Sequence, residues 1–189
     1  MDANDLKSLN LEIKKRMDGT IEHVRKELGG LRTGRATVSL LDPVQVEAYG
    51  AMVPINQVAS LSIPEPTLIV AQPFDPSLMS AIERAIQKSN LGLNPASDGK
   101  VLRIPIPALT EERRRELSRL VHKYAEEGRN AVRQVRRDAN ERLKKLLKDH
   151  KISEDDERRA LDEVQRITDQ HVVLIDDLQK KKDQELLGK

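Results

Sequence analysis

The stretch "KDHKISEDDERR", residues 148–159, lies between two long amphipathic segments and decides how they pack. Ser153 is a typical helix N-cap, and Asp156 stands three residues later, where the reciprocal partner of a capping box is expected. Only the short "KDHK" separates this helix start from the preceding segment, and so short a connection makes the two helices antiparallel neighbours. The acids that follow Ser153 suit the N-terminal end of a helix dipole, so they do not indicate a metal site.

Apolar residues recur at spacings of three and four along three segments, which is the pattern of an amphipathic helix. Thr110 and Ser153 are the expected N-caps of the second and third segments. The stripes comprise Leu6, Leu9, Ile13, Met17, Ile21, Val24, Leu28 and Leu31; then Leu117, Leu120, Tyr124, Val132, Val135, Ala139, Leu143 and Leu146; then Leu161, Val164, Thr168, His171, Ile175 and Leu178. No such helix is stable alone in water, so we expect a long antiparallel three-helix bundle.

A different pattern occupies residues 34–107, which contain all nine prolines of the chain. Short β-rich runs with a period of two occur at 44–50, 58–64, 67–73 and 101–107, the last read as a closing edge strand. Between them, Asp75 and Pro76 are expected to start a helix that ends near residue 90. The sequence therefore predicts an α+β protein in which a small β/α/β domain, 34–107, is inserted into a bundle formed by 1–33 and 108–189.

Two strands of chain must connect the predicted domains, one near "RTGRA" (32–36) and one near "PALT" (107–110). A two-stranded connection that contains Gly34 and Pro107 can act as a hinge, although a packed interface could prevent bending. We assign Arg32, Gly34, Arg35, Pro107 and Ala108 to this candidate hinge.

The composition excludes several classes of protein. The chain has 189 residues and no cysteine, which rules out disulfides, thiolate metal sites and thiol nucleophiles. No apolar run approaches the roughly 20 residues needed to span a bilayer, so we expect a cytoplasmic protein without a membrane partner. The four histidines are scattered, and no Ser/His/Asp arrangement or phosphate-binding loop is evident. The sequence predicts no enzyme, no cofactor and no metal.

Positive charge is concentrated in the second helical segment. Residues 129–151 contain nine basic and three acidic residues, a net charge of +6, whereas 153–179 contain three basic and nine acidic residues, a net charge of −6. Because antiparallel helices place these segments side by side, interhelical ion pairs are one explanation. On that explanation the protein is a helical adaptor for another protein.

Three arginines of this region favour an anionic partner instead. Arg129, Arg133 and Arg136 fall within an arc of roughly 60° on a helix, beside the apolar stripe. Arg133 has no acidic neighbour three or four residues away, and arginine suits bidentate phosphate recognition. With one Phe, two Tyr and no Trp, the chain lacks stacking platforms for single strands, so we expect it to grip folded RNA by phosphate and shape. Gly128, within this helix, indicates either close helix packing or close RNA approach.

Six stretches of the chain, taken together and in this order, are highly specific: "LRTGRA" (31–36), "SLLD" (39–42), "LGLNP" (91–95), "LTEERR" (109–114), "VRQVRRDAN" (132–140) and "LLKDHKISEDDERR" (146–159). Through them the sequence resembles the ribosome recycling factor family over nearly its whole length. The resemblance implies an L-shaped fold in which two flexible linkers join a three-helix bundle to a β/α/β domain. The resemblance implies a monomer that binds the large ribosomal subunit after termination and, with elongation factor G and GTP, splits ribosomes. It assigns binding of ribosomal RNA to Arg114, Arg133 and Arg136. A ribosome-bound factor that does not split subunits is a second alternative.

Overall fold

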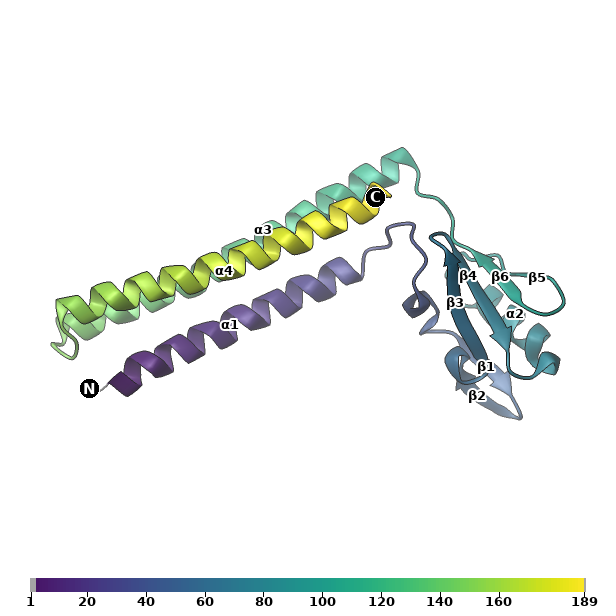
Figure 1. The fold of residues 1–189 in the computed structure, drawn as a ribbon, viewed down its shortest axis with the longest axis horizontal. Helices are drawn as coiled ribbons and strands as arrows, with labels where there is room; N and C mark the ends of the chain where they lie inside the picture. The colour runs from purple at the N-terminus through teal and green to yellow at the C-terminus, as the bar shows by residue number, and fades with distance from the viewer. Residues whose placement is uncertain (1–2, 189) are drawn as a thin grey trace. The chain divides into compact units, whose positions relative to one another are not determined.

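The structure is a computed structural model that describes residues 3–188, and it divides into two compact units. One unit, the bundle, comprises the described residues up to Arg32 and those from Glu112 onward. The other, the insert, comprises Thr33–Glu111. Long helices in the first unit and small sheets with one α-helix in the second confirm the predicted α+β class (Figure 1). The L shape and the hinge stay predictions.

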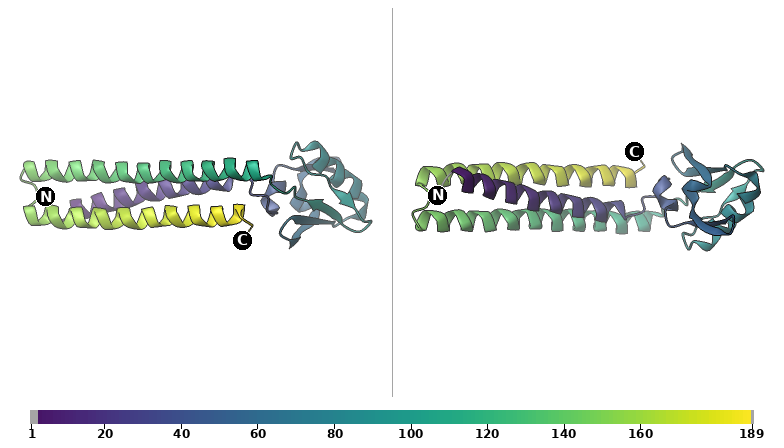
Figure 2. Two further views of the ribbon diagram at one scale, coloured as in Figure 1. Left: turned by 90° about the horizontal axis from the view of Figure 1, so that it is seen from above. Right: turned by 90° about the horizontal axis from the view of Figure 1, so that it is seen from below.

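Three helices form the bundle: α1 (Ala3–Gly29), α3 (Glu111–Lys148) and α4 (Glu154–Leu186). Both α1 and α4 lie alongside α3 and run antiparallel to it, as the views in Figure 2 show. The α1–α3 pairing includes an ion pair between Arg142 and Glu12, with 2.8 Å between Nη1 and Oε2. Among the described helices, none offers an uncharged apolar stretch of membrane-spanning length.

The turn between α3 and α4 is stabilised on both sides by local hydrogen bonds. The Lys151 N–H donates to the Leu146 carbonyl at 2.9 Å and the His150 N–H to the Leu147 carbonyl at 3.0 Å, with His150 in the left-handed region at φ 53°. This pattern is a Schellman C-cap. The predicted capping box is confirmed, because Ser153 Oγ accepts from the Asp156 N–H and the Asp156 carboxylate accepts from the Ser153 N–H.

The core of the bundle follows the three predicted stripes, with one correction in α3. The predicted stripe passes through Leu120 and Tyr124, but the fully buried positions are Val121, Ala125 and Gly128, and the two larger side chains lie half-buried beside them. A Cβ on Gly128 would lie closer to Val24 of α1 than carbon atoms normally approach, and 3.3 Å from Cδ1 of Ile175 in α4. Small residues are needed here because the helices approach closely, which explains Gly128 by helix packing.

The insert contains two antiparallel sheets and helix α2 (Met79–Lys88). One sheet pairs β1 (Gln45–Ala48) with β2 (Ala51–Pro54). The other has the order β3-β4-β6-β5, formed by β3 (Ala59–Glu65), β4 (Leu68–Pro73), β5 (Ala96–Ser97) and β6 (Leu102–Pro105). The prediction that 101–107 forms an edge strand was wrong, because β6 pairs with β4 on one side and with the short β5 on the other. Neither β5 nor β2 was predicted. Short 3₁₀ turns precede β1 (Val38–Leu41), follow β2 (Ile55–Gln57) and precede α2 (Pro76–Leu78).

The helix start predicted at Asp75 is displaced by one turn. The Asp75 side chain accepts from the Ser77 N–H at 3.0 Å, but it caps the 3₁₀ turn, and α2 begins at Met79. Ile82 and Ile86 of α2 are fully buried in an insert core that is separate from the bundle core. Each unit therefore has its own apolar core.

Candidate RNA-binding face

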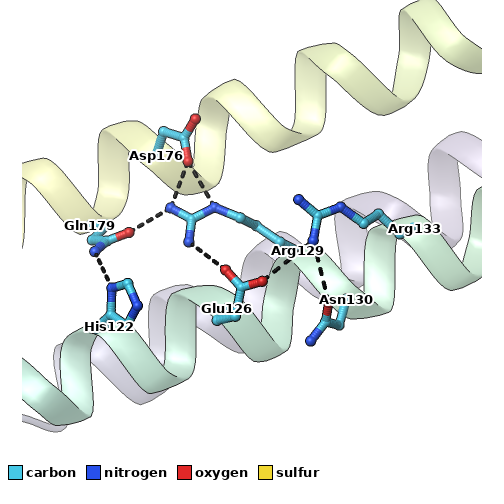
Figure 3. Close-up of polar contacts among 7 residues, drawn as sticks. All are labelled: His122, Glu126, Arg129, Asn130, Arg133, Asp176 and Gln179. Carbon is cyan, nitrogen blue, oxygen red and sulfur yellow. Dashed lines mark hydrogen bonds and ion pairs between the residues drawn. The ribbon is translucent and has the colours of Figure 1, made fainter.

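Arg129, the first of the three predicted arginines, is turned into the seam between α3 and α4. Its side chain is only 13% exposed. The guanidinium donates to Asp176 of α4 through Nε at 2.8 Å and Nη2 at 2.6 Å, to Gln179 through Nη2, and to Glu126 through Nη1 at 3.1 Å (Figure 3). Every nitrogen of this guanidinium thus has an acceptor within the bundle. For Arg129 the structure favours the interhelical ion-pair explanation.

Arg133 lies one turn further along and remains 43% exposed. Its Nη1 donates to Glu126 Oε1 at 3.4 Å and to Asn130 Oδ1 at 3.3 Å (Figure 3). Within the described part of the chain, its Nε and Nη2 have no acceptor. Periodicity missed the contact with Glu126, because a residue two turns away, at i−7, lies outside the i±3 and i±4 neighbours that were compared. The guanidinium keeps one edge available to a ligand.

Arg136 is intermediate between these two. Its Nη1 donates to Gln165 of α4 at 3.4 Å, a long and neutral contact. Its Nε is buried and has no hydrogen-bond partner among the described residues. The charge of Arg136 is therefore not neutralised by an ion pair within the described structure, but only part of its guanidinium is accessible.

Arg114, which the resemblance supplied, lies in the exposed first turn of α3. No described residue forms a hydrogen bond or an ion pair with its side chain. The 19 residues from Arg114 to Arg133 span roughly 28 Å along a helix. At 100° per residue, Arg114 falls within an arc of about 100° that also contains the other three arginines. A helical-wheel projection of the whole helix, instead of its second half alone, would have placed Arg114 on the same side as the other three arginines.

Charge pairing across α3 and α4 is limited to one residue of the basic region. Of the described lysines and arginines in 129–151, only Arg129 forms an ion pair with an acid of α4. Asp138 and Arg142 instead pair with Arg16 and Glu12 of α1, at 3.0 and 2.8 Å. The opposite net charges of the two segments are thus not explained by a ladder of interhelical bridges, and Arg133 and Arg136 keep positive charge at the surface.

Local contacts also shift the pKa values of several acids in the bundle. The hydrogen bond from Arg129 lowers the pKa of Glu126, with a smaller contribution from Arg133, so the carboxylate is ionised at neutral pH. A hydrogen bond from Arg16 likewise lowers the pKa of Asp138. Near the C-terminal end of α4, burial raises the pKa of Asp183. Arg133 therefore faces a permanent negative charge on Glu126 at neutral pH.

Histidines and acids do not assemble a metal site in residues 3–188: no group of three or more His, Asp or Glu side chains there has suitable geometry. His171, expected to be a packed residue, is 4% exposed. Its Nε2 lies 2.7 Å from Asp18 Oδ1 of α1 and its Nδ1 2.7 Å from the Ile167 carbonyl oxygen. His171 thus joins α4 to α1.

The candidate hinge residues lie close to the two ends of the insert, with Arg32 as the last residue of the first bundle segment. Gly34 adopts φ +75°, and a Cβ there would lie 3.1 Å from Cγ of Leu109 on the other connecting strand. Positive φ and this close approach both favour glycine. Arg35, Pro107 and Ala108 are exposed, whereas Arg32 is engaged in an interaction of its own. Whether the connection bends stays a prediction.

Comparison with known sequences identifies close relatives. The family model described as ribosome recycling factor matches residues 24–187. The ribosome-recycling factor of Bradyrhizobium diazoefficiens is 55% identical over 176 residues, which cover 93% of this chain and 94% of the relative. That of Rhodospirillum centenum is 54% identical over 183 residues, which cover 97% of each.

Two solved structures share the fold. A solution structure of the ribosome recycling factor aligns with a TM-score of 0.74 and 43% identity over 98% of both chains. The second belongs to models of the Thermus thermophilus ribosome recycling factor and the Escherichia coli elongation factor G bound to the E. coli post-termination complex. That recycling factor is 49% identical, with a TM-score of 0.64, over 97% of this chain and 99% of the other.

Proposed function

The chain belongs to the ribosome recycling factor family, and from this premise we propose that α3 anchors it to ribosomal RNA of the large subunit in post-termination complexes. With elongation factor G and GTP, it then promotes splitting of the ribosome into subunits that are reused for translation. The relative bound together with elongation factor G to a post-termination complex supports this assignment. The protein acts in the cytoplasm as a monomer.

The anchoring proposal rests on the exposure and the hydrogen bonds of the Arg133 side chain. It is half-exposed, its only acidic contact is a long one, and two of its three guanidinium nitrogens have no acceptor within residues 3–188. Arg114 and Arg136 extend the positive face along the same helix. Neutralising several phosphates releases condensed counterions, so binding should weaken steeply as salt rises.

The proposed role is mechanical. Elongation factor G pushes on the insert, and the connection around Gly34 turns that push into movement of the bundle against contacts between the subunits. GTP hydrolysis takes place on elongation factor G, so the role needs no catalytic residue in this chain.

A splitting assay tests the proposal. Post-termination ribosomes are sedimented with the protein, elongation factor G and GTP, and wild type is compared with Arg133→Glu at matched salt. Lys14→Glu, an equal charge change at an exposed position of α1, is the control. We expect wild type and the control to release free subunits and Arg133→Glu to bind poorly. Normal splitting by a folded Arg133→Glu protein would refute the anchoring role.

Hinge motion needs a separate test. Because the chain has no cysteine, single cysteines at the exposed Gln72 in the insert and Lys181 in the bundle accept a dye pair without background labelling. Single-molecule energy transfer on the free protein should give a broad or multiple distance distribution that narrows on the ribosome. One narrow distribution, identical in both states, would contradict a hinge.

A further inference from the structure

Arg133 is held by a chain of contacts that begins on α4, and we propose that Glu126 and Arg129 are positioning residues that present Arg133 to RNA. This inference rests on the proposed function. Asp176 and Gln179 fix the Arg129 guanidinium, Arg129 Nη1 fixes Oε2 of Glu126, and Oε1 of the same carboxylate accepts from Arg133 Nη1 (Figure 3). The carboxylate bridges two arginines, and only the outer arginine faces solvent.

The direction of this contact leaves a specific edge of Arg133 open. A guanidinium carries five N–H groups, two on each Nη and one on Nε. The two hydrogens of Nη1 serve Glu126 and Asn130. The remaining edge, Nη2 and Nε, has parallel donors that match two oxygens of one phosphate. Arg133 is thus oriented for bidentate contact before RNA arrives, which lowers the entropy lost on binding.

Simple electrostatics predicts the opposite role for Glu126. A carboxylate beside a phosphate-binding arginine repels RNA, so its removal should strengthen binding. A positioning carboxylate has the reverse effect, because its removal frees the Arg133 side chain and costs affinity even though the net charge becomes more positive. The sign of the change therefore separates the two roles.

The test compares Glu126→Ala with Glu127→Ala. Both variants remove one acid from adjacent exposed or half-exposed positions of α3, and alanine favours the helix in both. Glu127 contacts Lys123 at 3.9 Å and not Arg133, which makes it the matched control. Affinity for isolated large ribosomal subunits is measured at one salt concentration, with circular dichroism to verify folding. We expect Glu126→Ala to weaken binding about three- to tenfold and Glu127→Ala to leave it equal or stronger. Equal or stronger binding by Glu126→Ala would overturn the inference.

A double-mutant cycle separates this inference from the proposed function. In an Arg133→Ala background, Glu126→Ala should no longer weaken binding, because the residue that it positions is gone. The same loss in both backgrounds would mean that Glu126 acts through general helix stability and not through Arg133. If Arg133→Ala alone binds like wild type, the anchoring role itself is wrong, whatever the Glu126 variants do.

Discussion

The turn of α3 that carries Arg129 and the next turn, which carries Arg133, place the same side chain in different surroundings. Arg129 points to α4, where Asp176 and Gln179 accept its hydrogen bonds, whereas Arg133 points outward and, among residues 3–188, its side chain donates hydrogen bonds only to acceptors on α3 itself. The difference follows from about 40° of helical rotation. Residue type and spacing therefore indicate that an arginine cluster has a role, while the facing helix decides which member stabilises the bundle and which can bind a ligand.

The largest effect is expected at Gly128, the neighbour of Arg129 in α3, where α1 and α4 approach closely. Gly128→Val should destabilise the bundle by about 3 kcal/mol, because Val24 and Ile175 occupy the space that the new side chain needs. Val24 is β-branched and has little freedom to move away. Chemical denaturation measures the change in the free energy of unfolding.

Gly19→Val is the matched control for that substitution. Gly19 lies inside α1, and a Cβ at this position would meet no neighbouring side chain within 4 Å, so valine should leave the free energy of unfolding about unchanged or slightly higher. Destabilisation by both variants would show that helix propensity and backbone effects, not close packing at the seam, explain the result at Gly128.

A smaller effect is expected on ribosome binding when Arg133 or Arg136 is replaced. Arg133→Lys keeps the charge but removes the open Nη2/Nε edge, so affinity for large ribosomal subunits should fall about tenfold. Arg136→Lys should cost only about threefold, because Nε of Arg136 is buried and its Nη1 already contacts Gln165. Equal losses at the two positions would contradict the geometric distinction between them. Both affinities are measured at one ionic strength.

The smallest effect is the pH dependence of stability. Arg129 lowers the pKa of Glu126 from its ordinary 4.5, so the stability contributed by this pair is present above pH 4.5 and is lost as pH falls through the folded-state pKa. Burial raises the pKa of Asp183, so its contribution has the opposite sign and declines as pH rises above 3.8. The free energy of unfolding is measured with denaturant between pH 3 and 7. Compared with wild type, it should fall less toward acid pH in Glu126→Gln and decline less toward pH 7 in Asp183→Asn.

Much of the fold was predictable because its signals are local. Ser153 and Asp156 form the predicted capping box, and most residues of the three predicted apolar stripes lie in the bundle core. What the sequence missed depends on tertiary packing. The two-residue strand β5 exists because β6 supplies its hydrogen bonds, and the α3 core passes through Gly128 because α1 and α4 approach it closely. Local sequence patterns do not indicate which distant segment will pack against a strand or helix.

The arginine face was predictable only in part for the same reason. Periodicity placed Arg129, Arg133 and Arg136 together, but which of them pairs with an acid of α4 depends on a residue more than 40 positions away, Asp176. The contact between Arg133 and Glu126 spans two helical turns, beyond the neighbours that local spacing compares. Arg114 came from the resemblance, because its position on the same face becomes evident only when the whole helix is projected.

We propose that Arg133 binds phosphate and does not stabilise the bundle. The most direct test of this proposal is the salt dependence of binding to large ribosomal subunits for wild type and Arg133→Gln, with thermal unfolding of both proteins. For Arg133→Gln we predict weaker binding than for wild type, a plot of log affinity against log salt whose slope is less steep by about 1, and an unchanged Tm. An unchanged affinity and slope with a lowered Tm would contradict it and place Arg133 among the residues that hold the helices together.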